Sequence, residues 1–343
     1  MKTIALYPWS NRYLNNKIFE SNYLYNLFAE ENVYDESNPF RLLKRDLETY
    51  GYNLVTIDKI DNLDDAEYIL FFDMPPNDNQ FFQQCLAMNL FEKMILFLWE
   101  PKVVKPENYA VNSHMYFKRI FTWNDELVDR KKYYKFNFPE PSRIHNPYKK
   151  NFQQKKFCTL IAGNKRSLIE NELYSERIQA IKYFEKNAPS EFEYYGRGWY
   201  GPKNILKYAQ FIPFIKKKCY KGEAANKLKT LSEYKFCICY ENQKNVKGYI
   251  TEKIFDCFFA GTIPVYLGAD NVSDYIPEGC YIDRRNFANN KELHYYLTTI
   301  NEEEYNRYLS NIQSYLLSEP FFQFTDRAFA ENIIRILVKQ GDQ

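Results

Sequence analysis

YKFCICYENQKNVKGYITEKIFDCFFAGTIPVYLGADNVSDYIPEGCYID, residues 234–283, is the stretch that decides the fold. Its first part, Lys235–Tyr240, is a mostly apolar run of the kind that forms a strand buried in a parallel sheet. Thr251–Ala260 then carries apolar residues at helical spacing, and Gly261 ends it. Ile263–Leu267 is a second apolar run. A strand, a helix and a strand in this order predict a βαβ unit.

Short apolar runs and mixed polar stretches alternate through most of the remaining sequence, which predicts an α/β fold with parallel sheets. Further strands are predicted at Thr3–Tyr7, Asn53–Ile57, Tyr68–Phe72, Met94–Trp99, Arg119–Thr122, Phe157–Ala162, Phe192–Tyr195 and Cys280–Ile282. Helices are predicted at Phe40–Tyr50, Asn79–Lys93, Leu168–Asn187, Gly222–Ser232, Lys291–Leu317 and Asp326–Val338.

A polar, proline-rich stretch at residues 134–154 interrupts this rhythm and predicts a linker. The length of 343 residues suits two domains. We predict an N-terminal domain at 1–145, a second domain at 150–320 and a C-terminal helix within 321–343, for which packing toward the N-terminal domain is one option. Thr325 or Asp326 would cap this helix, and its inward residues would be Phe329, Ile333, Ile336 and Leu337.

Composition excludes several classes of protein. Hydrophobic residues make up 45% and charged residues 26%, so the chain is globular rather than disordered. A formal charge of +2 gives no reason to expect nucleic acid or an anionic membrane as partner. No apolar run approaches the roughly 18 residues of a membrane span. The seven cysteines are scattered without a CxxC pair, which favours reduced thiols, and we expect a soluble, cytoplasmic protein.

The sequence gives little support for a dinucleotide site or a metal site. Residues 196–201, GRGWYG, match GxGxxG after a strand, but Trp199 crowds the turn and Pro202 follows, so an ordinary glycine turn is favoured over a dinucleotide site. The three histidines lack metal-ligand spacing, and no Asp-x-Asp motif is present. We therefore expect no metal site, and protein cations would have to neutralise any bound phosphates.

Two carboxylates follow predicted strands. Glu100 comes directly after Met94–Trp99, and Asp73 comes after Tyr68–Phe72. Ligands bind outside the carboxyl ends of parallel strands, so both side chains would face a cleft. A carboxylate beside Trp99 would have a raised pKa and would suit a general base. By position alone, both residues also suit a loop or a helix cap.

The loop between the strand and the helix of the opening stretch suggests a ligand. The helix would begin at Glu252-Lys253, and a helix N-terminus with a free lysine suits phosphate oxygens. Glu252 would accept hydrogen bonds from sugar hydroxyls. These residues together predict a nucleotide-sugar type of site.

The order of these motifs resembles glycosyltransferase family 10, the α-1,3/4-fucosyltransferases. The resemblance covers about residues 155–290 and rests on Tyr234-Lys235-Phe236, Glu241-Asn242, Tyr249-Ile250-Thr251-Glu252-Lys253 and Ala260-Gly261-Thr262-Ile263-Pro264-Val265-Tyr266-Leu267-Gly268. It implies a GT-B architecture, with two facing Rossmann-like domains and a cleft between them. It also implies an inverting, metal-independent enzyme without cofactors that moves L-fucose from GDP-fucose to a hydroxyl, usually GlcNAc O3, of an acceptor glycan.

The resemblance also assigns roles to individual residues. Asn242, Tyr249, Glu252 and Lys253 match the family's donor contacts, with Lys253 at the diphosphate and Glu252 at ribose or fucose hydroxyls. Asn164 follows a strand in a turn that touches the donor in the family, although Gly163 replaces the family's serine. The remaining assignments are a phosphate-binding arginine and a general base, for which Arg177 and Glu100 are the best matches, leaving Asp73 a structural residue.

Alternatives to this hypothesis stay open. A glycosyltransferase that uses a different nucleotide sugar would show nearly the same motifs. A non-catalytic nucleotide-sugar or glycan-binding protein would fit the aromatic content of 18%. The expected partners are GDP-fucose and an oligosaccharide or glycoconjugate acceptor, and the chain looks like the soluble bacterial or viral type of the family.

Overall fold

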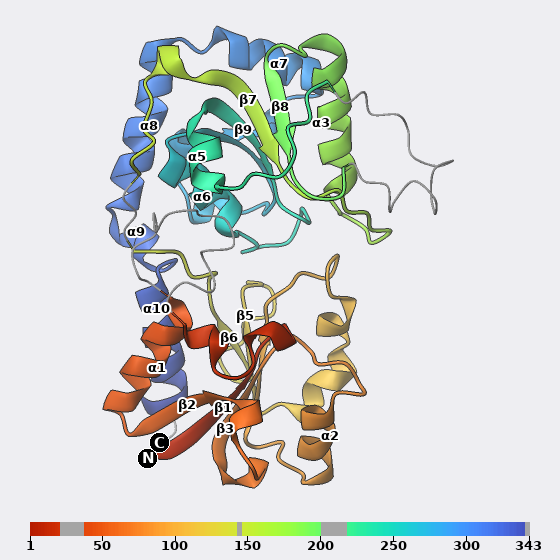
Figure 1. Ribbon diagram of the computed structural model, residues 1–343, viewed down its shortest axis with the longest axis vertical. Coiled ribbons are helices and arrows are strands. Elements are labelled where there is room, and N and C mark those ends of the chain that lie inside the picture. Colours follow the sequence, from red (N-terminus) through yellow and green to blue (C-terminus); the bar gives the residue numbers. More distant parts are fainter. Residues whose placement is uncertain (21–37, 143–145, 200–217, 340–343) are drawn as a thin grey trace.

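The computed structural model describes residues 1–20, 38–142, 146–199 and 218–339, so the predicted boundary at residue 145 lies outside the described residues. Two parallel sheets organise this part of the chain, one in each half of the molecule (Figure 1). The first is six-stranded in the order β2-β1-β3-β4-β5-β6, and the second is five-stranded in the order β11-β10-β9-β7-β8. The α/β prediction with parallel sheets is confirmed.

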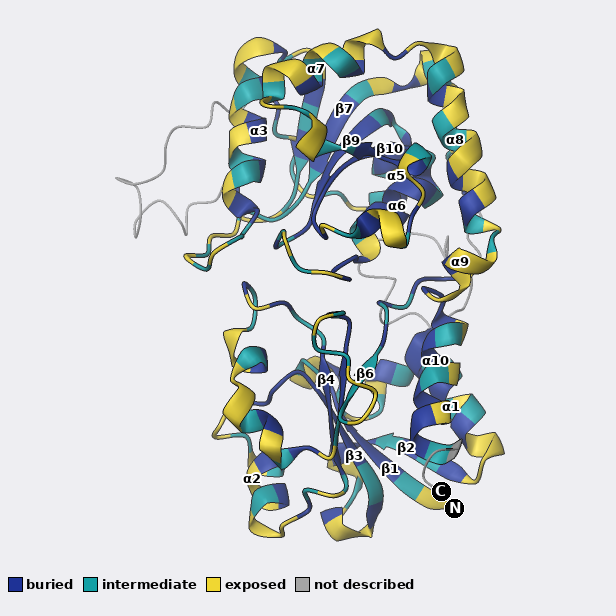
Figure 2. Ribbon diagram, turned by 180° about the vertical axis from the view of Figure 1, so that it is seen from behind, coloured by how far each residue is buried: buried dark blue, intermediate teal, exposed yellow. Residues whose placement is uncertain are grey.

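The N-terminal sheet reverses its strand order next to β1. β2 lies on one side of β1 and β3 on the other, so β1 and β3 flank a topological switch point. Helix α1 covers one face and α2 the other, and Figure 2 shows the central strands buried between them. The elements are β1 (Lys2–Tyr7), α1 (Pro39–Thr49), β2 (Tyr52–Thr56), β3 (Ala66–Phe72), α2 (Gln80–Ala87), β4 (Met94–Leu98), β5 (Arg119–Thr122) and β6 (Tyr133–Lys135).

The sequence did not predict β6, because its three half-buried residues form no apolar run and lie at the start of the predicted linker. The strand nevertheless pairs in parallel with β5, from Ile120↔Tyr133 to Thr122↔Lys135. It extends the sheet by one edge strand, where partial exposure is expected.

The C-terminal sheet contains the predicted βαβ unit. Gly261 follows its helix at φ 65°, a left-handed conformation that ends helices and favours glycine. The elements of this half are β7 (Lys156–Ile161), α3 (Tyr174–Asn187), β8 (Phe192–Tyr195), α5 (Lys227–Ser232), β9 (Tyr234–Tyr240), α6 (Glu252–Ala260), β10 (Ile263–Leu267), β11 (Ile282–Asp283), α7 (Asn290–Thr299) and α8 (Glu302–Leu316).

The helix boundaries differ from the predictions in four places. The prediction of a single helix at Lys291–Leu317 is wrong, because the helix is interrupted between α7 and α8. Asn301 starts the second helix by accepting a hydrogen bond from the backbone N of Glu304 at 2.9 Å, as an N-cap does. Helices α3 and α5 begin six and five residues later than predicted, and α2 ends before Met88.

The last helices return to the N-terminal half. α9 (Glu319–Phe322) leads into α10 (Asp326–Ile334), which packs against α1 (Figure 1). Thr325 is the N-cap, and its Oγ1 accepts a hydrogen bond from the backbone N of Ala328 at 3.1 Å. The predicted inward residues are confirmed as buried: Phe329, Ile333, Ile336 and Leu337.

Within the described residues, two segments cross between the halves of the molecule, and they are hydrogen-bonded to each other. Glu140 lies on the first crossing, where its backbone N donates to the carbonyl of Phe324 at 2.7 Å. The backbone N of Asp326 donates back to the carbonyl of Glu140 at 2.8 Å, and Ser142 Oγ donates to the Asp326 carboxylate at 2.5 Å. This paired crossing forms one side of the space between the sheets.

A second junction holds the halves together through Asp125. Its carboxylate accepts hydrogen bonds from Asn271 Nδ2 at 3.0 Å and Tyr275 Oη at 2.6 Å, and it pairs with Lys135 at 2.6 Å.

Among the helices of the described residues, none is long and apolar enough to cross a bilayer. All seven cysteines are buried free thiols.

Candidate active site

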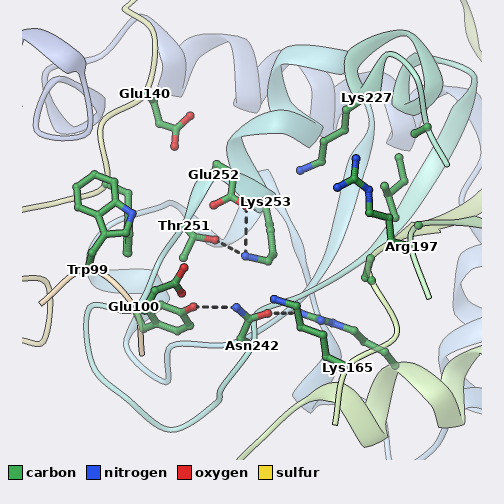
Figure 3. Close-up of a pocket in the computed structure, with 18 of the residues that line it drawn as sticks. Trp99, Glu100, Glu140, Lys165, Arg197, Lys227, Asn242, Thr251, Glu252 and Lys253 are labelled. Atoms are coloured by element: carbon green, nitrogen blue, oxygen red, sulfur yellow. Dashed lines mark hydrogen bonds and ion pairs between the residues drawn. The ribbon is translucent and has the colours of Figure 1, made fainter. Parts of the chain in front are cut away.

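A cavity of about 550 Å³ lies between the two halves, a volume in the range of small-molecule sites. Both halves contribute to its lining (Figure 3). The first half and the crossing supply Trp99, Glu100, Phe138, Pro139 and Glu140. The second half supplies the ends of β7 and β8, the start of α6 and the side chains of Lys165, Arg177, Arg197, Glu223, Lys227, Asn242 and Tyr249.

The structure gathers six of the seven predicted site residues around this one cavity: Glu100, Arg177, Asn242, Tyr249, Glu252 and Lys253. Asn164 is not part of the lining, although its neighbours Gly163 and Lys165 are. Its side-chain Nδ2 donates to the carbonyl of Gly198 at 3.1 Å. Asn164 therefore braces the glycine turn beside the cavity.

Glu100 is positioned by Asp73. Oδ1 of Asp73 accepts hydrogen bonds from the backbone N of Trp99 and of Glu100, each at 2.8 Å, and from Asn108 Nδ2 at 2.5 Å. Asp73 is buried at the end of β3, next to β4, with φ of 66°. Because β3 and β4 are neighbouring parallel strands, the carboxylate of Asp73 can hold the backbone of Glu100. This is the structural role expected for Asp73.

The electrostatic environment suits Glu100 for accepting a proton. Burial, and then the negative charge of Asp73, raise the pKa of Glu100 to about 7. Lys253 and Lys165 act in the opposite direction and Glu252 in the same one. A carboxylate with a pKa near neutrality has the strength required of a general base at physiological pH.

Glu241 organises the start of α6, and sequence reasoning gave it no role. Its fully buried carboxylate accepts hydrogen bonds from the backbone N of Thr251 at 2.9 Å and from Thr251 Oγ1 at 3.0 and 2.8 Å. Thr251 occupies the predicted N-cap position, but its hydroxyl bonds to Glu241 instead of to the helix backbone. The capping carboxylate therefore comes from the end of β9.

Lys253 is not free, contrary to the prediction. Its Nζ lies 3.1 Å from Glu241 Oε2 and 3.4 Å from Glu252 Oε1, and it donates to Thr251 Oγ1 at 2.8 Å. The sequence could not show this, because Glu241 approaches only when β9 and α6 fold against each other. The contacts fix the ammonium group at the cavity wall.

Arg177 holds the end of β9 from the other side. Its Nη2 donates to the backbone carbonyls of Tyr240 and Glu241, each at 2.7 Å, and to Asn242 Oδ1 at 3.0 Å. Asn242 Nδ2 in turn donates to Tyr249 Oη at 3.4 Å (Figure 3). The buried arginine thus orients the amide of Asn242 and places a second cation beside the cavity.

Glu252 faces the cavity as an ionised group. Confinement in the pocket disfavours its charge, but Lys253 and Lys227 outweigh this and lower its pKa to about 2. Lys227 itself pairs with Asp256, one helical turn beyond Glu252. Glu252 can therefore accept hydrogen bonds from ligand hydroxyls over the whole physiological pH range.

The glycine turn after β8 is a packing feature next to the cavity. A Cβ on Gly196 would lie 2.0 Å from the carbonyl oxygen of Ala162, so the close approach requires glycine. Trp199 Nε1 donates to the same carbonyl at 2.7 Å. The last residues of the GxGxxG match, 200 and 201, lie outside the described residues.

Basic side chains, rather than a cluster of metal ligands, mark the cavity. Within the residues that the structure describes, no group of three or more His, Cys, Asp or Glu side chains is arranged to hold a metal ion. The cavity lining contains five basic side chains, Lys165, Arg177, Arg197, Lys227 and Lys253, which can neutralise an anionic ligand.

Comparison with known proteins finds a protein family that resembles the second half of the chain. Residues 170–333 match the family model described as glycosyltransferase family 10 (fucosyltransferase), C-terminal. This match covers slightly less than half of the chain, and residues 170–333 are called the family 10 region below. The family 10 region contains Arg177, Asn242, Tyr249, Glu252 and Lys253, whereas Glu100 and Glu140 lie outside it.

Individual relatives match over short segments. An alpha-(1,4)-fucosyltransferase of Arabidopsis thaliana is 37% identical over 73 residues, which are 21% of this chain and 18% of that protein. The alpha-(1,3)-fucosyltransferase FucT of Helicobacter pylori is 39% identical over 85 residues, which are 24% of this chain and 17% of that protein. The chain thus spans less than a fifth of the length of these two relatives.

Solved structures match over nearly the whole chain. A crystal structure of an alpha1,3-fucosyltransferase with GDP aligns with 98% of this chain and 90% of that chain, with a TM-score of 0.55 and 17% identity. A DNA-modifying beta-glucosyltransferase covers 98% and 99%, with a TM-score of 0.53 and 11% identity. At these identities the likeness shows the fold alone, and that fold is the predicted GT-B architecture.

Proposed function

We propose that the protein is an inverting fucosyltransferase that moves L-fucose from GDP-fucose to a hydroxyl of an acceptor glycan. The observation that carries the proposal is the pairing of two halves of a site across one cavity. Glu100, with a pKa of about 7, lies on one side, and Arg177 and Lys253 lie at the family 10 side. The fucosyltransferase names of the family and its relatives support the choice of reaction.

The proposed reaction needs only groups that this chain supplies. Glu100 takes the proton from the acceptor hydroxyl while the hydroxyl oxygen attacks the anomeric carbon of fucose. The bond between that carbon and the phosphate oxygen breaks, and its electron pair leaves with GDP. Attack opposite the leaving group inverts the anomeric configuration. Lys253 and Arg177 stabilise the negative charge that grows on the diphosphate.

Glu252, Asn242 and Tyr249 complete the proposed donor site. Glu252 is ionised and suits ribose or fucose hydroxyls, and its charge would also stabilise positive charge developing on the fucose. One fold neighbour is an alpha1,3-fucosyltransferase in a crystal structure with GDP-fucose, which supports this choice of donor. No metal or cofactor is included, because protein cations would neutralise the diphosphate. GlcNAc O3 of an oligosaccharide or glycoconjugate is the proposed acceptor group.

A donor screen tests the proposal. GDP and GDP-fucose should raise the melting temperature of the protein, whereas UDP and UDP-sugars should not. Transfer to an N-acetyllactosamine acceptor should survive EDTA, which checks the metal-independent mechanism. No response to any guanosine ligand would refute the donor assignment.

Loss of the proposed base separates an enzyme from a binding protein. Glu100→Gln should abolish transfer while GDP still binds, because Glu100 lies across the cavity from the proposed phosphate site. Full transfer activity in this variant would show that another residue accepts the proton.

A further inference from the structure

Glu140 is a buried carboxyl group that the proposed mechanism does not use. Only 3% of the residue is exposed, and among the described residues its Oε1 has no hydrogen-bond partner. Its backbone N and carbonyl both bond to the second crossing, at Phe324 and Asp326, so the residue is held firmly in place. A buried carboxyl oxygen without a partner is unfavourable, and such a group requires an explanation.

The surroundings of Glu140 show where its missing partner would come from. Glu140 lines the cavity, and its carboxyl group points toward the start of α6 (Figure 3). The charged groups around it are Asp256, Glu252, Lys227 and Lys253. The two lysines are paired with Asp256 and with Glu241, and they only partly offset the unfavourable surroundings of Glu140. Burial and the neighbouring carboxylates raise the pKa of Glu140 well above its ordinary value.

The residues around Glu140 favour a sugar hydroxyl as its partner over the phosphates or the nucleobase of a ligand. The cations proposed to hold the diphosphate, Arg177 and Lys253, are fixed by contacts at the end of β9. On the side of the first half and the crossing, the lining near Glu140 is aromatic and apolar, from Trp99, Phe138 and Pro139. A carboxyl group next to an aromatic face suits a sugar ring, whose hydroxyls form hydrogen bonds while its C–H face packs on the aromatic ring.

We propose that Glu140 binds a hydroxyl of the sugar that is transferred, and so helps the enzyme to select the sugar of its donor. The inference rests on the proposed function, because it assigns one more contact to the same donor. The transferred sugar is favoured over the acceptor, because the charges that act on Glu140 come from α5 and α6, on the donor side, and Glu252 on α6 faces the same space. A ligand hydroxyl would supply the partner that Oε1 lacks.

The test compares nucleotide with nucleotide sugar. Affinities of GDP and GDP-fucose are measured by calorimetry for the wild type, Glu140→Ala and Glu140→Gln. The control is Ser142→Ala, which removes a side-chain hydrogen bond of the same crossing and leaves Glu140 intact. We expect Glu140→Ala to weaken GDP-fucose about tenfold and GDP not at all, the scale of one lost hydrogen bond in a buried site. Glu140→Gln, which still bonds to a hydroxyl, should retain most of the affinity.

The outcomes are distinguishable. An equal loss for GDP and GDP-fucose would show that Glu140 only supports the pocket, and would overturn the proposal. Unchanged donor affinity with a raised KM for the acceptor would place the residue on the acceptor side and overturn it as well. If the wild type binds neither ligand, the proposed function itself fails. Melting curves of the variants and of Ser142→Ala identify any variant that does not fold, and Glu140→Gln then provides the comparison.

Discussion

Asp73→Asn isolates the charge that helps to raise the pKa of the proposed base. The pKa of Glu100 rises from 4.5 to about 7, with burial as the largest cause and the charge of Asp73 as the second. Removing this charge should lower the pKa of Glu100, and about one pH unit, or 1.4 kcal/mol, is the scale expected for a nearby like charge. The substitution is conservative in geometry, because all three donors to Asp73 bond to Oδ1, which an asparagine retains.

The assay is the pH dependence of kcat/KM for transfer from GDP-fucose. A general base acts when ionised, so wild-type activity should fall as the pH drops below about 7. In Asp73→Asn the same fall should occur about one pH unit lower, because the carboxylate of Glu100 ionises more easily. Asp64→Asn, the same chemical change at an exposed position, should leave the profile unchanged. A folded Asp73→Asn enzyme with the wild-type midpoint would refute the electrostatic coupling between the two carboxylates.

Three further predictions concern binding and stability. Lys253→Ala should weaken GDP binding by about 1.5–3 kcal/mol, the scale of a charge-assisted hydrogen bond, and unchanged calorimetric affinity would remove Lys253 from the phosphate site. Gly248→Ala should lower the free energy of unfolding by about 2–4 kcal/mol in urea titrations, since φ is +79° and its Cβ would lie 2.4 Å from the carbonyl oxygen of Trp123. Gly51→Ala, at φ +80° with open space, should cost only about 1–2 kcal/mol, and equal losses would contradict the steric argument. Glu140→Leu should raise the melting temperature of the ligand-free protein by a few degrees, because it removes a buried oxygen without a partner, and a lower melting temperature would count against that reading.

The sequence predicted those parts of the site that depend on local order. Glu100 could be placed because the apolar run of β4 ends at Leu98, and the carboxyl ends of parallel strands meet at one edge of a sheet. Glu252 and Lys253 could be placed because an amphipathic helix starts there and Gly261 ends it. The roles proposed for these residues remain predictions that the experiments above address.

Other features depend on contacts between distant segments and gave no signal in the sequence. Glu140 lines the cavity because the two crossings pair with each other. The sequence next to Glu140 contains no pattern that predicts this pairing. The break before α8 depends on one asparagine within an otherwise continuous helical pattern. Asn164 was predicted at the donor by resemblance, whereas the structure shows its side chain bonded to Gly198 and outside the cavity lining.

The contacts of Lys253 bear on how the proposed site would stabilise its leaving group. Glu241 has no exposed surface, and it holds both the start of α6 and the lysine ammonium group. Arg177 is fixed in a similar way by two carbonyls at the end of β9. Cations that are already oriented need not reorganise when charge develops on a diphosphate, and this preorganisation is what makes electrostatic stabilisation effective. The buried Glu241 lowers the net positive charge of the site, which weakens the binding of a free nucleotide. It also fixes the positions of the cations. The site therefore favours a diphosphate whose charge develops at those positions in the transition state.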